Sequence, residues 1–409
     1  MFIADLHIHS QYSMATSRDC IPEILDLWAR RKGLGLIGTG DFTHPAWREE
    51  LKRKLVPAEE GLYRLQPEYL LPVEGEIKAQ PQPRLVVSGE ISSIYKKDGK
   101  VRKIHSLILL PGLSQAEKLS QRLEQIGNIR SDGRPILGLD SRQLLEITLE
   151  ICPSAIFIPA HIWTPHFSLL GYSGFEAVEE CFEDLTPYIY ALETGLSSDP
   201  GMNRLVSALD TYLLVSNSDA HSPANLAREA NIFTTECSYP AVWQALQRRD
   251  RQALSGTIEF FPQEGKYHYD GHRACRVCFS PAETAAVEAV CPVCGRKLTL
   301  GVLNRVEYLS DRRVAPTDRL DYCEYLLPLV ELVAGALQMG KGSKRVQQRY
   351  LQLLCELGSE LKILREVPLA EIERQAGITI ANGVQRMRSG ELKLSPGYDG
   401  EYGKVIWGE

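Results

Sequence analysis

The sequence predicts an α/β protein: a (β/α) barrel, then a cysteine-rich zinc-binding element and a mainly helical C-terminal domain. Three observations predict this order. Short apolar runs alternate with amphipathic stretches over residues 1–255, a pattern typical of parallel βα units. Two C-x2-C pairs lie within residues 265–305, and apolar residues recur at helical spacing over residues 315–409. These three ranges are the domains that we expect.

The composition is that of an ordinary soluble protein. The chain has 409 residues, of which 44% are hydrophobic and 24% charged. No apolar run approaches the ~18 residues that a membrane-spanning helix needs. Four of the ten cysteines have metal-type spacing, which favours a reducing compartment over disulfide formation. We therefore expect a cytoplasmic protein that does not associate with membranes.

The apolar runs of the first domain end in histidine or acidic residues, as "FIADLHIHS", "RLVVSGE", "AIFIPAHIW" and "YLLVSNSDAHS" illustrate. In a (β/α) barrel, catalytic groups gather where the strands end. Residues two apart on an extended chain face the same way, so two pairs of side chains can each hold one ion. These pairs are His7 with His9, and Asp219 with His221.

Imidazole and carboxylate ligands suit zinc, manganese or iron. Glu90 and His161 end two further strands, and together with the two pairs they predict a polynuclear metal site. We expect catalysis to depend on Asp219, Glu90 and His161. Asp219 is also a candidate to receive the proton of an attacking water.

His105 begins an apolar run instead of ending one. The segment "EISSIYKKDGKVRKIH" is nearly symmetric about "KKDG", which predicts a hairpin. A four-residue loop at 96–99 would place Glu90 directly opposite His105, close enough to share an ion. Glu90 would then bridge two ions, with His105 and His161 on the second.

Three further polar residues have open roles. Asp41, in "GTGDFTHP", is either a metal ligand or the cap of a structural loop, and the same alternatives hold for His44. Glu193, in "LETGLSSD", is a ligand, a group that orients a histidine, or a substrate contact.

The cysteine-rich element carries a strong zinc signal. "CRVC" and "CPVC" form a C-x2-C-x12-C-x2-C pattern. Four thiolates close a tetrahedral site and leave no position open for substrate, so the predicted zinc is structural. Its expected ligands are Cys275, Cys278, Cys291 and Cys294.

The helical domain contains a glycine-rich stretch, "MGKGSKRV", in which Lys344 and Arg345 precede a helical pattern. Backbone N–H groups at helix starts bind phosphate, and basic residues add affinity for a nucleic-acid backbone. The alternative is a plain loop between helices.

The motifs "DLHIHS", "GTGDFTHP", "GEI…H", "PAH" and "SDAH" resemble the PHP (polymerase and histidinol phosphatase) superfamily. Followed by the cysteine element, "GKGSKRV" and "PGYDGEYGK", they resemble endonuclease Q within it. The resemblance implies a distorted (β/α)7 barrel with two or three zinc or manganese ions. It also implies a DNA repair endonuclease that cuts on the 5′ side of deaminated bases (uracil, hypoxanthine, xanthine) or abasic sites, with a sliding clamp as a candidate partner.

One departure concerns the third ion. Many members have Asp or His shortly after H-x-H, where this chain has "SQYSMATS", so a third ion would depend on Asp41.

Recognition of a deaminated base would require its extrusion from the duplex. We expect an aromatic wall for it and polar partners for its edge. The candidates for the wall are Tyr12, Phe42, Trp163 and Tyr172, and those for the edge are Asn217, Ser197 and Ser198. Our expected substrate-binding residues are Asn217, Glu193, Ser198, Tyr12, Lys344 and Arg345.

Two other functions fit part of the sequence. A PHP phosphatase for a small phosphate ester would use the barrel but not the zinc element. A non-catalytic DNA-binding or polymerase-accessory protein would not need the predicted metal ligands of the barrel.

Overall fold

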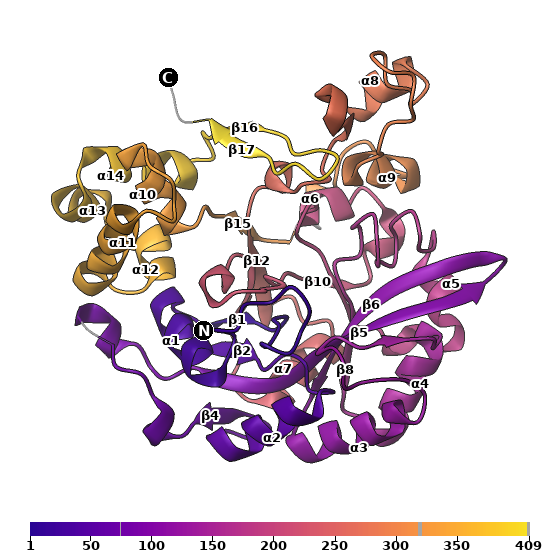
Figure 1. Ribbon diagram of the computed structural model, residues 1–409, viewed down its shortest axis with the longest axis horizontal. Helices are drawn as coiled ribbons and strands as arrows, with labels where there is room; N and C mark the ends of the chain where they lie inside the picture. Colours follow the sequence, from indigo (N-terminus) through magenta and orange to yellow (C-terminus); the bar gives the residue numbers. More distant parts are fainter. Residues whose placement is uncertain (74, 318–320, 407–409) are drawn as a thin grey trace.

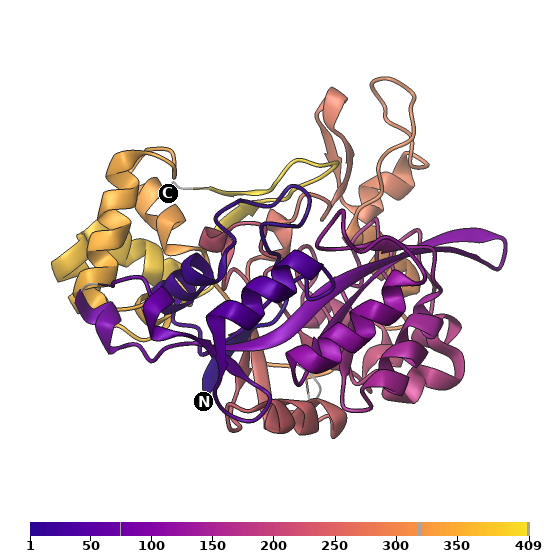
Figure 2. The ribbon, with the colours of Figure 1, turned by 60° about the horizontal axis from the view of Figure 1, so that its bottom comes forward.

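The computed structural model describes residues 1–73, 75–317 and 321–406. It has a central mixed sheet with helices around it and a separate helical cluster formed by the C-terminal region (Figure 1). The cysteine-rich element projects from the opposite end of the molecule, and the β16–β17 hairpin spans the distance between the two (Figures 1 and 2). No helix of the described residues is long and apolar enough to cross a membrane.

The strands are mostly short. They are β1 (Phe2–Asp5), β2 (Leu36–Gly38), β3 (Leu55–Pro57), β4 (Tyr63–Leu65), β5 (Arg84–Lys97), β6 (Lys100–Leu110), β7 (Ile136–Leu137), β8 (Ile156–Pro159), β9 (Ala191–Glu193), β10 (Leu213–Val215), β11 (Ala230–Phe233), β12 (Leu254–Glu259), β13 (Asp270–His272), β14 (Val277–Phe279), β15 (Cys323–Tyr325), β16 (Lys393–Ser395) and β17 (Lys404–Ile406).

The α-helices are α1 (Pro22–Lys32), α2 (Pro45–Lys54), α3 (Leu113–Glu124), α4 (Ser141–Ile151), α5 (Val178–Phe182), α6 (Pro200–Asn203), α7 (Tyr239–Gln247), α8 (Pro281–Ala286), α9 (Val302–Leu309), α10 (Leu329–Leu337), α11 (Lys344–Leu357), α12 (Glu360–Arg365), α13 (Leu369–Ala376) and α14 (Ile378–Arg388). The 3-10 helices are η1 (Pro67–Tyr69), η2 (Gly75–Ala79), η3 (Glu183–Tyr188), η4 (Ser207–Leu209), η5 (Pro223–Asn225), η6 (Pro262–Glu264) and η7 (Arg273–Cys275).

The expected parallel barrel is present in part. Strands β1, β2 and β5 pair in parallel, as do β9 and β10. Strands β6 and β8 pair antiparallel, as do β11 with both β1 and β12. Strands β9 and β10 form a sheet of their own, so hydrogen bonds among the described strands do not close a ring. Strand β15 extends the main sheet beside β12, so this sheet includes chain beyond residue 255.

The β5–β6 hairpin corrects our predicted register. Lys97 pairs with Lys100, so the turn is the two residues Asp98 and Gly99 and not a four-residue loop at 96–99. Both turn residues have positive φ, 51° and 73°, which suits the Asp-Gly pair of a tight hairpin. His105 therefore pairs with Ser92, two positions from Glu90. Because side chains alternate with a period of two, this offset leaves Glu90 and His105 on the same face.

Local sequence explains how individual elements begin and end. Helix α1 has Pro22 at its first position and ends before Gly33, whose φ of 91° is the left-handed conformation that glycine tolerates. Helix α11 begins after Ser343, whose side chain accepts a hydrogen bond from the Val346 amide. The glycine-rich stretch thus precedes a helix, as the sequence predicts.

Candidate metal centre

Residues on or just after five strands bring the predicted ligands together, and Glu90, which we expected at the end of a strand, lies in the interior of β5. His7 and His9 follow β1, Glu90 and His105 lie on β5 and β6, His161 follows β8, and Asp219 follows β10. The nitrogen and oxygen atoms that could hold an ion form two groups, each within 4.8 Å: His7, His9, Glu90 and Asp219, and Glu90, His105 and His161. Glu90 belongs to both groups, so one carboxylate can contact two ions.

His7 indicates that the first group fits a metal ion. Its Nδ1 lies 3.0 Å from Oε1 of Glu193. Its Nε2 is buried and has no hydrogen-bond partner among the described residues. That atom faces Oε2 of Glu90 at 3.5 Å and Oδ1 of Asp219 at 3.6 Å. A proton on Nδ1, donated to Glu193, leaves the Nε2 lone pair free for a cation between these carboxylates.

Asp41 orients His9 and lies outside both ligand groups. Its Oδ1 lies 3.0 Å from Nδ1 of His9. Its Oδ2 accepts hydrogen bonds from the backbone N–H of Ser10 at 2.7 Å and from the hydroxyl of Ser13 at 2.9 Å. Asp41 thus fixes both the imidazole and the loop that follows it. Asp41 is not in either ligand group, since one oxygen contacts His9 and the other contacts the loop, and its role as a ligand stays a prediction.

Glu193 has a similar orienting position. Besides contacting His7, it accepts hydrogen bonds from the backbone N–H of His161 at 2.7 Å and from the side chain of Asn217 at 2.8 Å. Asn217 is 1% exposed and points into this network. The expectation that Asn217 reads a base edge is therefore wrong: burial removes it from any substrate.

Two histidines named from the sequence also lie outside the ligand groups. Nδ1 of His221 contacts the backbone oxygen of Asp219 at 2.8 Å, and its ring packs on that of His9, with centroids 4.4 Å apart. His221 is therefore next to the first ligand group but not in it, and its role as a ligand stays a prediction. His44 contacts the Arg130 carbonyl at 3.0 Å and stacks on Tyr12, with centroids 4.3 Å apart.

The protonation of the ligands follows from burial and charge. Burial lowers the pKa of His105 to about 4, so its ring is neutral at pH 7 and able to bind a metal. Burial also opposes a charge on His7, but Glu193 and Glu90 raise its pKa well above the ordinary value. In the absence of metal the ring of His7 is therefore protonated on both nitrogens. An incoming cation must displace one of these two protons.

Arg134 is a residue of the site that our sequence reasoning missed. Its Nη1 lies 3.0 Å from Oε2 of Glu90, and its side chain is 24% exposed. It comes from the loop before β7, where Asp132 accepts a hydrogen bond from the Met14 amide. No strand end or spacing marks this arginine in the sequence. It places a partly accessible positive charge beside the shared carboxylate.

The expected aromatic wall is mostly part of the core. Phe42 is fully buried and Trp163 is 2% exposed, so neither can stack on a base, and these two predictions are wrong. Ser198 is 2% exposed and its hydroxyl contacts that of Thr194 at 3.0 Å, which also removes it as an edge reader. Tyr12 is half-buried against His44, and Tyr172 is exposed.

The cysteine-rich element contains a third group of potential ligands. His272, Cys275, Cys291 and Cys294 have donor atoms within 4.8 Å of one another. Cys278 is not in this group, and its sulfur lies 4.0 Å from the Pro396 carbonyl. Three of the four expected cysteines therefore converge, and a histidine from β13 occupies the fourth place. Lys344 and Arg345 are exposed at the start of α11.

The chain is similar to known proteins over most of its length. A family model, the MJ0043 C-terminal domain, matches residues 328–391. The uncharacterized protein YqxK of Bacillus subtilis is 31% identical over 310 residues, which cover 74% of this chain and 73% of YqxK. The uncharacterized protein MJ0043 of Methanocaldococcus jannaschii is 31% identical over 254 residues, or 59% of this chain but only 31% of MJ0043.

Two solved structures match the whole chain. The lesion-specific endonuclease PfuEndoQ of Pyrococcus furiosus has a TM-score of 0.86 and 29% identity, covering 100% of this chain and 96% of its own. Endonuclease Q in complex with a 27-mer duplex that has an abasic lesion at the active site has the same score and identity, covering 100% and 97%.

Proposed function

The chain belongs to the family of YqxK and of endonuclease Q, and from this premise we propose that it is a DNA repair endonuclease. It hydrolyses the phosphodiester bond on the 5′ side of deaminated bases (uracil, hypoxanthine, xanthine) or of abasic sites. The observation that carries the proposal is the sharing of Glu90 by two buried ligand groups. Two cations held by one carboxylate suit in-line displacement at a phosphodiester.

The two ligand groups would hold zinc or manganese. His7, His9, Glu90 and Asp219 would hold one ion, and Glu90, His105 and His161 the other. When bound, such ions lower the pKa of water and stabilise negative charge on a phosphate. A third ion has no ligand group of its own among the described residues, since both oxygens of Asp41 are engaged by His9, Ser10 and Ser13.

The protein's own groups would bind the phosphate and move the proton. Arg134 approaches the site from its accessible side, and its planar guanidinium suits a phosphodiester oxygen. Asp219 has an 18% exposed side chain, and only its Oδ1 faces the two histidines. Its other oxygen is available to accept a proton from attacking water. Glu193 and Asp41 would hold the imidazoles in their metal-binding orientation.

DNA would also contact surfaces outside the barrel. Lys344 and Arg345 stand exposed at the first turn of α11, where backbone N–H groups favour a phosphate. The element around His272 and the cysteines projects from the other end of the molecule (Figure 2). A structural zinc there would fix that projection. A sliding clamp remains our candidate protein partner.

The test is cleavage of end-labelled duplex DNA with one uracil or one abasic site, beside undamaged DNA. We expect a metal-dependent nick on the 5′ side of the lesion, lost after chelation and in the His7→Ala variant. DNA binding without cleavage under any divalent metal would contradict the proposal and favour an accessory protein. Hydrolysis of a phenyl phosphate without DNA cleavage would favour a phosphatase.

A further inference from the structure

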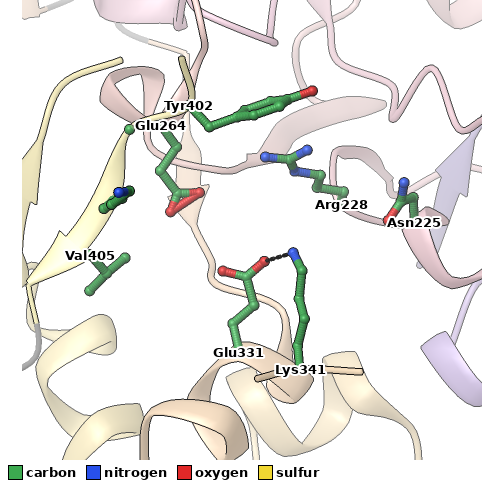
Figure 3. Close-up of a pocket in the computed structure, with 9 residues that line it drawn as sticks. Asn225, Arg228, Glu264, Glu331, Lys341, Tyr402 and Val405 are labelled. Atoms are coloured by element: carbon green, nitrogen blue, oxygen red, sulfur yellow. Dashed lines mark hydrogen bonds and ion pairs between the residues drawn. The ribbon is translucent and has the colours of Figure 1, made fainter. Parts of the chain in front are cut away.

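A pocket lies where the barrel, the helical cluster and the β16–β17 hairpin meet, and we call it the junction pocket (Figure 3). Its volume is about 430 Å³, and its walls include Arg228, Glu264, Glu331, Lys341 and Tyr402. This volume is in the range of small-molecule sites. None of these residues belongs to the metal centre.

Residues next to the walls of the junction pocket contact segments that lead to the metal ligands. The amide of Ala227, next to Arg228, donates a hydrogen bond of 2.9 Å to Asp5, which lies two residues before His7. Gly265, next to Glu264, packs so closely on Ser197 that an added Cβ would lie 2.0 Å from the serine hydroxyl. Both walls of the pocket are thus tied to segments that lead into the metal centre.

Glu264 is a buried acid without a partner. It is 6% exposed, and its Oε1 has no hydrogen-bond partner among the described residues. Burial, reinforced by the charge of Glu331, raises its pKa to about 7. An unpaired carboxyl in a cavity destabilises the folded protein. A ligand with a hydrogen-bond donor would pair with the carboxyl and remove that destabilisation.

Arg228 faces Glu264 across the pocket. In Figure 3 the guanidinium of Arg228 points toward Glu264, whose carboxylate lies between Arg228 and Glu331, and the ring of Tyr402 lies above Arg228. The guanidinium of Arg228 packs on the Phe260 ring at 4.1 Å from its centroid, which fixes its position. Glu331 and Lys341 form an ion pair of 3.0 Å at the opposite wall. The pocket therefore combines a donor, an acceptor and an aromatic surface.

We propose that the junction pocket receives the extruded base and reads the edge that deamination creates. Arg228 donates to the exocyclic oxygen of the base, Glu264 accepts from the adjacent ring N–H, and Tyr402 stacks on the base. This inference rests on the proposed function. The new candidates for base recognition are the residues of the junction pocket. They take the place of four buried residues, Phe42, Trp163, Asn217 and Ser198.

The chemistry of this edge separates uracil from cytosine and hypoxanthine from adenine. Uracil and hypoxanthine present a carbonyl beside a ring N–H, whereas cytosine and adenine present an amino group beside a bare ring nitrogen. Arginine has donors only, so an amino group in front of Arg228 leaves two donors opposed and unpaired. A site built to pair with polar groups strongly rejects a base that leaves them unpaired. An abasic site offers no base and makes no use of these contacts.

The test compares three duplexes, with uracil, hypoxanthine or an abasic site at the same position. We expect Glu264→Ala and Arg228→Met each to lower kcat/KM for the uracil and hypoxanthine duplexes by at least about tenfold. Hydrogen bonds to a base edge contribute about this factor to discrimination between bases. Cleavage at the abasic site should change by less than about twofold, because an abasic site makes neither of these contacts. That activity also shows that the variants are folded. Arg122→Met, an exposed arginine on α3, is the matched control.

Two results would overturn the inference. Equal loss on all three duplexes would mean that the pocket contacts the DNA backbone or supports the fold. Unchanged cleavage of uracil would mean that the base is read elsewhere. Failure of the unmodified protein on every duplex would instead contradict the proposed function itself, so the two failures are distinguishable.

Discussion

Oε1 of Glu90 lies 2.6 Å from Nδ1 of His105, although the two residues are offset by two positions across the β5–β6 hairpin. The right-handed twist of a two-stranded ribbon and the length of the glutamate side chain bring diagonal neighbours into contact. The contact makes Glu90 the residue on which both ligand groups depend. Other ligands serve one group each.

This arrangement predicts unequal losses of metal. Glu90→Ala should release both barrel ions and lower cleavage of lesion-containing DNA by more than about 100-fold, beyond the effect of losing an orienting group. His105→Ala should release one ion only. Metal analysis of the purified variants checks both expectations. Retention of two tightly bound ions by Glu90→Ala would show that the groups do not share this ligand.

Asp41 should behave as an orienting group and not as a ligand. Asp41→Asn keeps the shape of the side chain but weakens its contacts with His9 and Ser10, so we expect about a 10- to 100-fold loss of metal affinity. At saturating metal the number of bound ions should remain that of the unmodified protein. A lower number at saturation would restore Asp41 as a direct ligand. A titration followed by metal analysis distinguishes the two results.

The cysteine-rich element offers a choice between His272 and Cys278. The geometry predicts that Cys291→Ser and His272→Ala lose the structural zinc, while Cys278→Ser retains it. Release of zinc to a chromogenic chelator measures the three variants side by side. Loss of zinc from Cys278→Ser, with retention in His272→Ala, would instead support the four-cysteine site that the spacing predicts.

The sequence predicted the ligands better than it predicted their surroundings. His7, His9, His161 and Asp219 converge from positions just after β1, β8 and β10, which the apolar runs reveal, and Glu90 joins them from the interior of β5. The register of the hairpin was wrong by two residues, yet His105 reaches Glu90 because an even offset preserves the face.

Groups that act through contacts between distant segments were harder to predict. Asp41 and Asn217 are polar residues at strand ends, like the ligands. Only the fold shows that Asp41 accepts a hydrogen bond from the loop and that the side-chain amide of Asn217 donates one to Glu193. Arg134 lies in a loop without any periodic signal. His272 stands outside the C-x2-C pairs, so its position depends on how β13 folds back on β14. Spacing along the chain does not contain this information.

Glu264 predicts a pH dependence of stability. Its pKa is about 7 in the folded protein and 4.5 in its ordinary state, so between these values the folded protein holds a proton that the unfolded chain has lost. Stability contributed by this group is therefore present below pH 4.5 and falls as the pH rises to about 7. Glu331 raises this pKa, and Arg228 and Lys341 oppose it.

Glu264→Gln removes the titration and keeps the shape of the side chain. We expect its melting temperature to match that of the unmodified protein near pH 4.5 and to exceed it above pH 7, with a difference of up to about 3 kcal/mol in unfolding free energy. Thermal unfolding across this pH range measures the difference, and Glu236→Gln, at an exposed position, is the control. Parallel pH profiles for Glu264→Gln and the unmodified protein would show that Glu264 is already ionised in the folded state. The carboxyl would then have a partner in the pocket, and no unpaired acid would remain for a base to pair with.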